Sequence, residues 1–154
     1  MTEIQIFELS EVADLLDLTP SIVKNWTIGR PLTIKPSIRA SRGKGSRNLY
    51  SRDDVLVLAL AAQLSRDGFA LNTVQRVLKE LKGRSHLLGS ALSALVISSS
   101  GGKPEIKFLA GGPITIGVHE QLRADVMGRY VLNLTKLASW IESRISKVPG
   151  ASHR

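Results

Sequence analysis

Two short helices and a tight turn are indicated by residues 9–26, which read Leu9-Ser10-Glu11-Val12-Ala13-Asp14-Leu15-Leu16-Asp17-Leu18-Thr19-Pro20-Ser21-Ile22-Val23-Lys24-Asn25-Trp26. Ser10 is expected to cap the first helix, because its hydroxyl can accept an unpaired backbone N–H. Thr19 as N-cap and Pro20 at the first helical position then start a second helix. Two short helices separated by so short a turn predict a helix-turn-helix, whose second helix enters the major groove of DNA.

The sequence after the second helix predicts a wing. Gly29, Pro31 and Pro36 stop the helical pattern. We expect two short strands to pair beyond this point, residues 32–34 and residues 48–50. The loop between them, Ser41-Arg42-Gly43-Lys44-Gly45-Ser46, contains glycines that let the backbone turn and approach a partner closely.

Two further helices are expected to complete an N-terminal head. Ser51 and Asp54 have the spacing of a capping box at the start of the third helix, and Gly68 follows its end. The fourth helix has apolar residues at helical spacing and ends before Gly83. Residues 1–84 are therefore predicted to form a winged helix-turn-helix domain of four helices.

Residues 85–148 have a different, strand-rich pattern. The predicted strands are residues 94–98, 105–109, 113–118 and 130–134, a weak helical pattern covers 119–127, and an amphipathic helix covers 135–145. The fold class is predicted as α+β and mainly α, with the winged helix-turn-helix head followed by a small α/β module. Residues 149–154 are expected to be a frayed tail.

Charge is concentrated where the wing is predicted. Residues 1–17 carry five acids and no base, whereas residues 18–52 carry eight Lys or Arg and no acid. The chain as a whole has a net charge of +8. A long stretch of cations without anions favours a polyanionic partner, and a solvated basic loop is the plainer alternative.

Several classes of function find no support in the sequence. There is no Cys, so disulfides and thiolate metal sites are excluded. The three His residues are far apart, and we find no nucleophile elbow, phosphate loop or paired-carboxylate pattern. We therefore expect no enzyme activity, no metal and no cofactor. The acidic N-terminus and the short apolar runs predict a cytoplasmic protein without a signal peptide or membrane span, located at the nucleoid.

The N-terminal half resembles the MerR-type winged-helix regulators. The matching pieces, in order, are residues 7–16, 18–26, 47–55 and 68–74. Where the family usually has Arg, an aromatic pair and Glu, this chain has Lys24-Asn25-Trp26-Thr27. The family's long dimerisation helix is replaced by residues 92–134 and a short last helix. The resemblance implies binding of duplex DNA, and a phosphate contact from the aromatic residue at the position of Trp26.

The residues predicted to bind DNA lie on the second helix and the wing. Asn can pair with adenine, Lys can reach guanine or a phosphate, and the wing cations can hold the phosphate backbone. Trp26 could equally bond a phosphate or anchor the core, and Tyr50 resembles a wing tyrosine that donates to a phosphate. The predicted set is Thr19, Ser21, Lys24, Asn25, Trp26, Arg39, Arg42, Lys44, Arg47 and Tyr50.

The sequence thus predicts a sequence-specific, double-stranded-DNA-binding transcriptional regulator. Residues 85–148 are expected to form a homodimer or a higher oligomer, with ligand sensing as the alternative for this module. Two other functions stay open. One is an architectural or mobile-element protein, such as an excision or phage packaging factor. The other is an adaptor whose basic loop docks an acidic partner protein.

Overall fold

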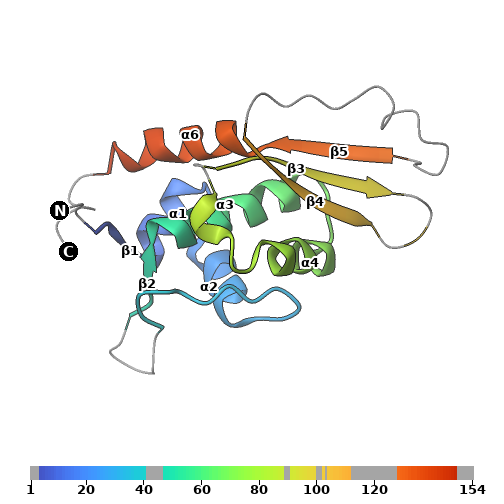
Figure 1. Cartoon of the computed structure of the whole chain (residues 1–154). Coiled ribbons are helices and arrows are strands. Elements are labelled where there is room, and N and C mark those ends of the chain that lie inside the picture. The colour runs from blue at the N-terminus through green and yellow to red at the C-terminus, as the bar shows by residue number, and fades with distance from the viewer. Residues whose placement is uncertain are drawn as a thin grey trace.

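The computed structural model describes residues 4–40, 47–88, 91–99, 102, 104–111 and 128–148. The described residues form an α+β fold with two small sheets (Figure 1). The elements of the N-terminal part are β1 (Ile6–Glu8), α1 (Leu9–Leu15), α2 (Pro20–Ile28), β2 (Leu49–Ser51), α3 (Arg52–Arg66) and α4 (Leu71–Leu81). After a short 3-10 turn at Ser85–Leu87 follow β3 (Leu92–Ser99), β4 (Glu105–Ala110), β5 (Gly128–Asn133) and α6 (Leu134–Ile145).

The helix starts follow local capping rules. The prediction that Ser10 caps the first helix is wrong, because α1 begins at Leu9 with Glu8 as N-cap, and Glu11 Oε2 accepts the Glu8 backbone N–H at 2.8 Å. The other start signals are confirmed. Thr19 Oγ1 accepts the Ile22 N–H at 3.3 Å, and the Ser51 and Asp54 side chains cap α3 reciprocally.

The predicted pairing of residues 32–34 with residues 48–50 is also wrong. Leu49–Ser51 pairs antiparallel with Ile6–Glu8, a strand that the sequence pattern did not reveal. Residues 32–34 form no strand. The chain before the predicted wing loop meets β2 through an isolated bridge between Arg39 and Leu49 and through a hydrogen bond from Ser37 Oγ to Ser51 Oγ at 3.0 Å. The N-terminal strand occupies the position that the prediction gave to residues 32–34.

The C-terminal part forms a three-stranded antiparallel sheet in the order β4-β3-β5. Three of the four predicted strands are found here, and the predicted strand 113–118 and weak helix 119–127 lie outside the described residues. The five apolar residues predicted on one face of the last helix are all buried, namely Leu134, Leu137, Ala138, Ile141 and Ile145.

One hydrophobic core joins the two halves of the chain. Figure 1 shows α6 lying along α1 and α3, with the three-stranded sheet beside it and α4 next to β4. Buried residues of α1, α3, β3 and α6 belong to a single cluster, so the C-terminal helix completes the core of the N-terminal head. No helix among the described residues is long and apolar enough to cross a membrane.

Candidate nucleic-acid interface

Helix α2 has one buried and one exposed face. Val23, Trp26 and Thr27 are buried against the head. The opposite face is exposed, and its residues are Ser21, Ile22, Lys24, Asn25 and Ile28. Ser21, Lys24 and Asn25, which belong to the predicted DNA-binding set, therefore point away from the core. Trp26 is only 7% exposed, which favours its role as a core anchor over a contact with a phosphate.

A buried hydrogen bond holds α2 against β2. The Thr27 hydroxyl donates to the Val23 carbonyl at 2.9 Å and lies 2.8 Å from the Tyr50 hydroxyl. Because the single Thr27 hydroxyl proton is used on Val23, the Tyr50 hydroxyl is the donor to Thr27. Tyr50 is fully buried, and burial raises the pKa of its hydroxyl. This corrects the predicted phosphate contact, since the Tyr50 hydroxyl is used inside the core.

We predict that Tyr50→Phe lowers stability and leaves DNA contacts unchanged. The variant removes one buried hydrogen bond while keeping the ring, so the free energy of unfolding should fall by about 1 kcal/mol. Urea unfolding measures this loss. The salt dependence of DNA affinity should match that of the unaltered protein. A shallower dependence would indicate that Tyr50 contacts a phosphate and would contradict this prediction.

Residues 29–36 are fixed by hydrogen bonds from helices on either side. The Ile34 N–H donates to the Trp26 carbonyl at 2.7 Å, and the Thr33 N–H donates to Gln75 Oε1 of α4 at 3.0 Å. Leu32 and Ile34 are buried, whereas Arg30 and Lys35 are exposed. This alternation anchors the segment by its apolar side chains and directs two cations outward.

Two of the predicted arginines lie on the described residues beside the predicted wing loop, residues 39–40 and 47–49, which we call the wing base. Arg39 and Leu49 exchange backbone hydrogen bonds of 3.1 and 2.7 Å, and Arg39 Nε donates to the Arg47 carbonyl at 3.3 Å. Arg47 Nη1 lies 2.9 Å from Glu8 Oε1, in an ion pair whose arginine side chain is 71% exposed. Arg42 and Lys44 lie outside the described residues.

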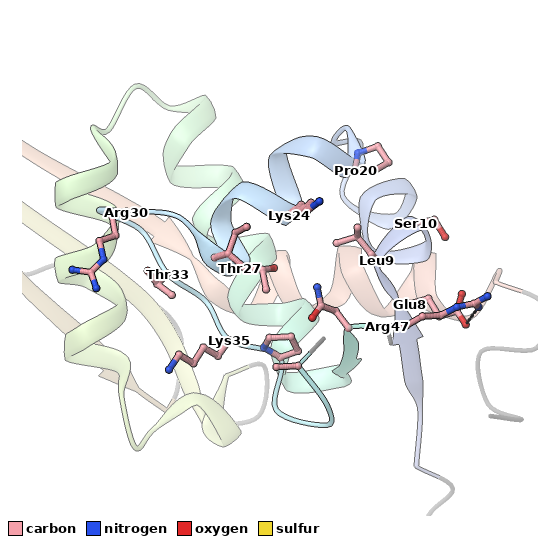
Figure 2. A pocket seen from close by; sticks show the side chains of 14 residues that line it. Glu8, Leu9, Ser10, Pro20, Lys24, Thr27, Arg30, Thr33, Lys35 and Arg47 are labelled. Atoms are coloured by element: carbon pink, nitrogen blue, oxygen red, sulfur yellow. Dashed lines mark hydrogen bonds and ion pairs between the residues drawn. The ribbon is translucent and has the colours of Figure 1, made fainter. Parts of the chain in front are cut away.

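A cleft of about 920 Å³ separates α2 from the wing base. Figure 2 shows its lining, which comes from α1, α2, residues 30–36 and the wing base. Its cations are Lys24, Arg30, Lys35 and Arg47, and its single anion is Glu8. Lys24, Arg30 and Lys35 form no ion pair with any described acid. We call these four cations the cleft cations. They concentrate positive charge beside the exposed face of α2.

The structure adds residues that the sequence did not single out. Arg30 and Lys35 join Lys24 and Arg47 in the cleft, and the acid-free composition of residues 18–52 was the signal that included them. Ile22 and Ile28 are exposed on α2, by 38% and 69%. Their exposure is visible only in the structure, and no signal in the sequence identified this pair.

A second basic group lies on and after α4 and differs from the cleft cations; its members are Arg76, Lys79, Lys82 and Arg84. Arg76 Nη2 donates to the Pro104 carbonyl at 3.2 Å and so fastens α4 to the start of β4. Lys79 and Lys82 line a separate hollow of about 530 Å³ that also includes Lys35. Arg76 of this group therefore makes a contact within the fold, unlike Lys24, Arg30 and Lys35 of the cleft, for which no ion pair with a described acid is found.

The described residues contain no group of three or more His, Asp or Glu that could hold a metal ion. Comparison with known families gives one match: residues 7–81 match the family described as MerR HTH family regulatory protein. A search of curated proteins found no match for the chain. The matched region begins within β1 and ends with α4, and it contains α2 and every residue that lines the cleft. Residues 7–81 of this chain are therefore similar to the MerR helix-turn-helix family, which suggests a DNA-binding transcriptional regulator.

Proposed function

We propose that the protein is a sequence-specific transcriptional regulator that inserts α2 into the major groove of duplex DNA. The observation that carries this proposal is the exposure of Ser21, Lys24 and Asn25 on α2, directly beside the other three cleft cations. A helix that follows a tight turn and exposes polar side chains suits the groove. The cations beside it are placed to hold the sugar-phosphate backbone.

Base reading is assigned to the middle of the exposed face. Asn25 can form a bidentate pair with adenine through its amide. Ile22 lies three residues earlier, one turn away on the same side of the helix, and an apolar side chain can contact the methyl group of thymine. The proposed operator therefore contains A·T base pairs where α2 enters the groove.

We predict that Asn25→Ala relaxes specificity without changing salt dependence. Loss of a bidentate base contact costs about 1–3 kcal/mol on the preferred site and little on unrelated DNA. Competition binding with the preferred and a scrambled duplex measures this ratio. Ser139→Ala, at an exposed position of α6, is the matched control and should leave the ratio unchanged.

The experiment that tests the proposed function is selection of bound fragments from random genomic DNA at near-physiological salt. Enrichment of one sequence, followed by a change in transcription from a promoter that contains it, supports a regulator. Binding that is cooperative along one locus and bends DNA without any effect on transcription would instead indicate an architectural protein. Failure to bind any duplex at low salt would favour an adaptor for an acidic partner.

We also propose that the protein acts as a homodimer through residues 85–148. Two heads related by two-fold symmetry would fix the spacing of two half-sites. Support comes from the outer face of the sheet, where Leu109 and Val131 are each 37% exposed on the two edge strands. Sedimentation at micromolar concentration tests this, because a monomer alone would contradict it.

A further inference from the structure

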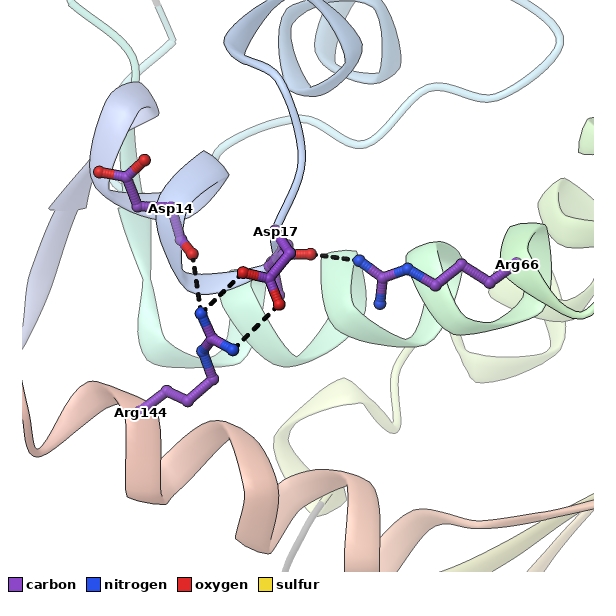
Figure 3. A network of polar contacts seen from close by, with 5 residues as sticks. Asp14, Asp17, Arg66 and Arg144 are labelled. Atoms are coloured by element: carbon purple, nitrogen blue, oxygen red, sulfur yellow. Dashed lines mark hydrogen bonds and ion pairs between the residues drawn. The ribbon is translucent and has the colours of Figure 1, made fainter.

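The turn between α1 and α2 is held by side chains from distant helices. Helix α1 has only seven residues and no basic residue in its last turn. Two arginines from other helices donate to backbone carbonyls at its C-terminal end. Arg66 of α3 donates to the Leu16 carbonyl, and Arg144 Nη2 of α6 donates to the Asp14 carbonyl at 3.1 Å (Figure 3).

Arg144 also binds the side chain of Asp17 in the turn between α1 and α2. Its Nη1 and Nη2 atoms lie 3.0 and 2.9 Å from the two carboxylate oxygens of Asp17, the two-pronged geometry that suits a guanidinium and a carboxylate. The Arg144 guanidinium carbon lies 5.0 Å from the centre of the Trp140 ring, a cation–π contact one turn earlier on α6. We call the contacts of Arg144 with Asp14 and Asp17 the turn latch.

The turn latch acts where the chain direction is set. Asp17 has a φ of 53°, a left-handed conformation that Asp and Asn tolerate better than most residues. Thr19, the N-cap of α2, follows two residues later. Since α2 contains the proposed base-reading residues, the position of Asp17 affects the direction in which these residues point.

The other end of α6 leads directly into the sheet. Asn133 is the last residue of β5 and also the N-cap of α6, so no loop separates strand from helix. A second ion pair, between Glu142 of α6 and Arg52 of α3, holds the same helix turn to the head. The C-terminal sheet is thus connected to the turn before α2 through one continuous, well-anchored helix.

We propose that Arg144 is a positioning residue for DNA binding: α6 holds the helix-turn-helix through the turn latch and so controls how α2 is presented. This proposal rests on the proposed function of α2. It assigns the C-terminal segment a part in regulating the DNA-binding site, because a partner or ligand that moves β5 would act on α2 through Arg144. Arg144 itself makes no contact with DNA in this scheme.

The test is a double-mutant cycle on DNA affinity with Arg144→Ala, Asp17→Asn and the double variant. Asn keeps the tolerance for the left-handed backbone and removes the charge. Each single variant should bind the selected duplex about fivefold more weakly, with an unchanged salt slope. The double variant should be no weaker than either single variant, because both remove the same contact. Lys147→Ala removes a neighbouring cation just beyond the end of the same helix and is the control.

Amide hydrogen exchange of the DNA-free protein supplies a second readout. Exchange at residues 17–22 should accelerate in both single variants, with little change in α4. Unaltered exchange in the turn, additive effects on affinity, or a weakening equal to that of Lys147→Ala would each overturn the proposal. A lower salt slope in Arg144→Ala would also overturn it, by making Arg144 a phosphate contact. If the unaltered protein binds no duplex, the proposed function fails, while the exchange experiment still tests the latch.

Discussion

Triple replacement of Arg30, Lys35 and Arg47 by Ala is expected to weaken binding to every duplex by about 100-fold at moderate salt. Each phosphate contact releases condensed counterions, and the slope of log affinity against log salt is about −0.9 per contact on duplex DNA. Losing three contacts should therefore make the slope shallower by about 2.7. Fluorescence anisotropy over a series of salt concentrations measures both quantities on a specific and a scrambled duplex.

The effect should be the same for both duplexes, because phosphate contacts carry no sequence information. The ion pair between Arg47 and Glu8 does not prevent the contact, since an exposed pair of this kind contributes about 1 kcal/mol or less. Replacing three exposed cations on β4, on α6 and just after α6, namely Lys107, Lys136 and Lys147, removes the same charge elsewhere. If this control lowered the slope equally, net charge and not the cleft would account for binding.

The helix-turn-helix could be predicted because its signals are local. Thr19 and Pro20 start α2, and Ser51 with Asp54 starts α3, through contacts between residues at most three apart. The burial of the predicted face of α6 follows equally from a spacing along one helix. Each of these signals lies within a few consecutive residues, so it can be recognised in the sequence without knowing the rest of the fold.

The wing base could not be predicted because its partner is distant and short. Leu32 and Ile34 are buried and Lys35 is exposed, as a strand pattern requires. The backbone N–H groups of this segment nevertheless donate elsewhere, that of Ile34 to the Trp26 carbonyl and that of Thr33 to Gln75 Oε1. The strand that pairs with Leu49–Ser51 has three residues, too few to show an alternation. β2 is equally short, so its sequence does not show whether the Tyr50 side chain points to solvent, where it could contact a phosphate, or into the core, where the structure places it.

The cleft and the turn latch depend on tertiary structure in the same way. Composition marked residues 18–52 as basic, but only the fold shows that Arg30, Lys35 and Arg47 share one cleft with Lys24. Asp17 and Arg144 are separated by 127 positions, and neither belongs to a recognisable local motif. Contacts between such distant residues leave no periodic trace in a single sequence.

The second large effect expected is loss of stability when the contact of α6 with the head is weakened. Ile141 is fully buried in the core that α6 shares with α1 and α3. Ile141→Ala should lower the free energy of unfolding by about 2–5 kcal/mol, through lost apolar burial and the cavity left behind. Ile4→Ala makes the same chemical change at a side chain that is 70% exposed and should cost about 0.5 kcal/mol or less.

Urea unfolding should show one transition for the full chain, because a single hydrophobic core contains residues of both halves. For the same reason, a fragment of residues 1–84 should lack a cooperative transition, since it loses the five buried side chains of α6 and exposes the surface of α1 and α3 that they cover. Cooperative unfolding of this fragment, at a midpoint close to that of the full chain, would contradict the shared core. It would show that the head is a self-sufficient domain, with α6 attached to its outside.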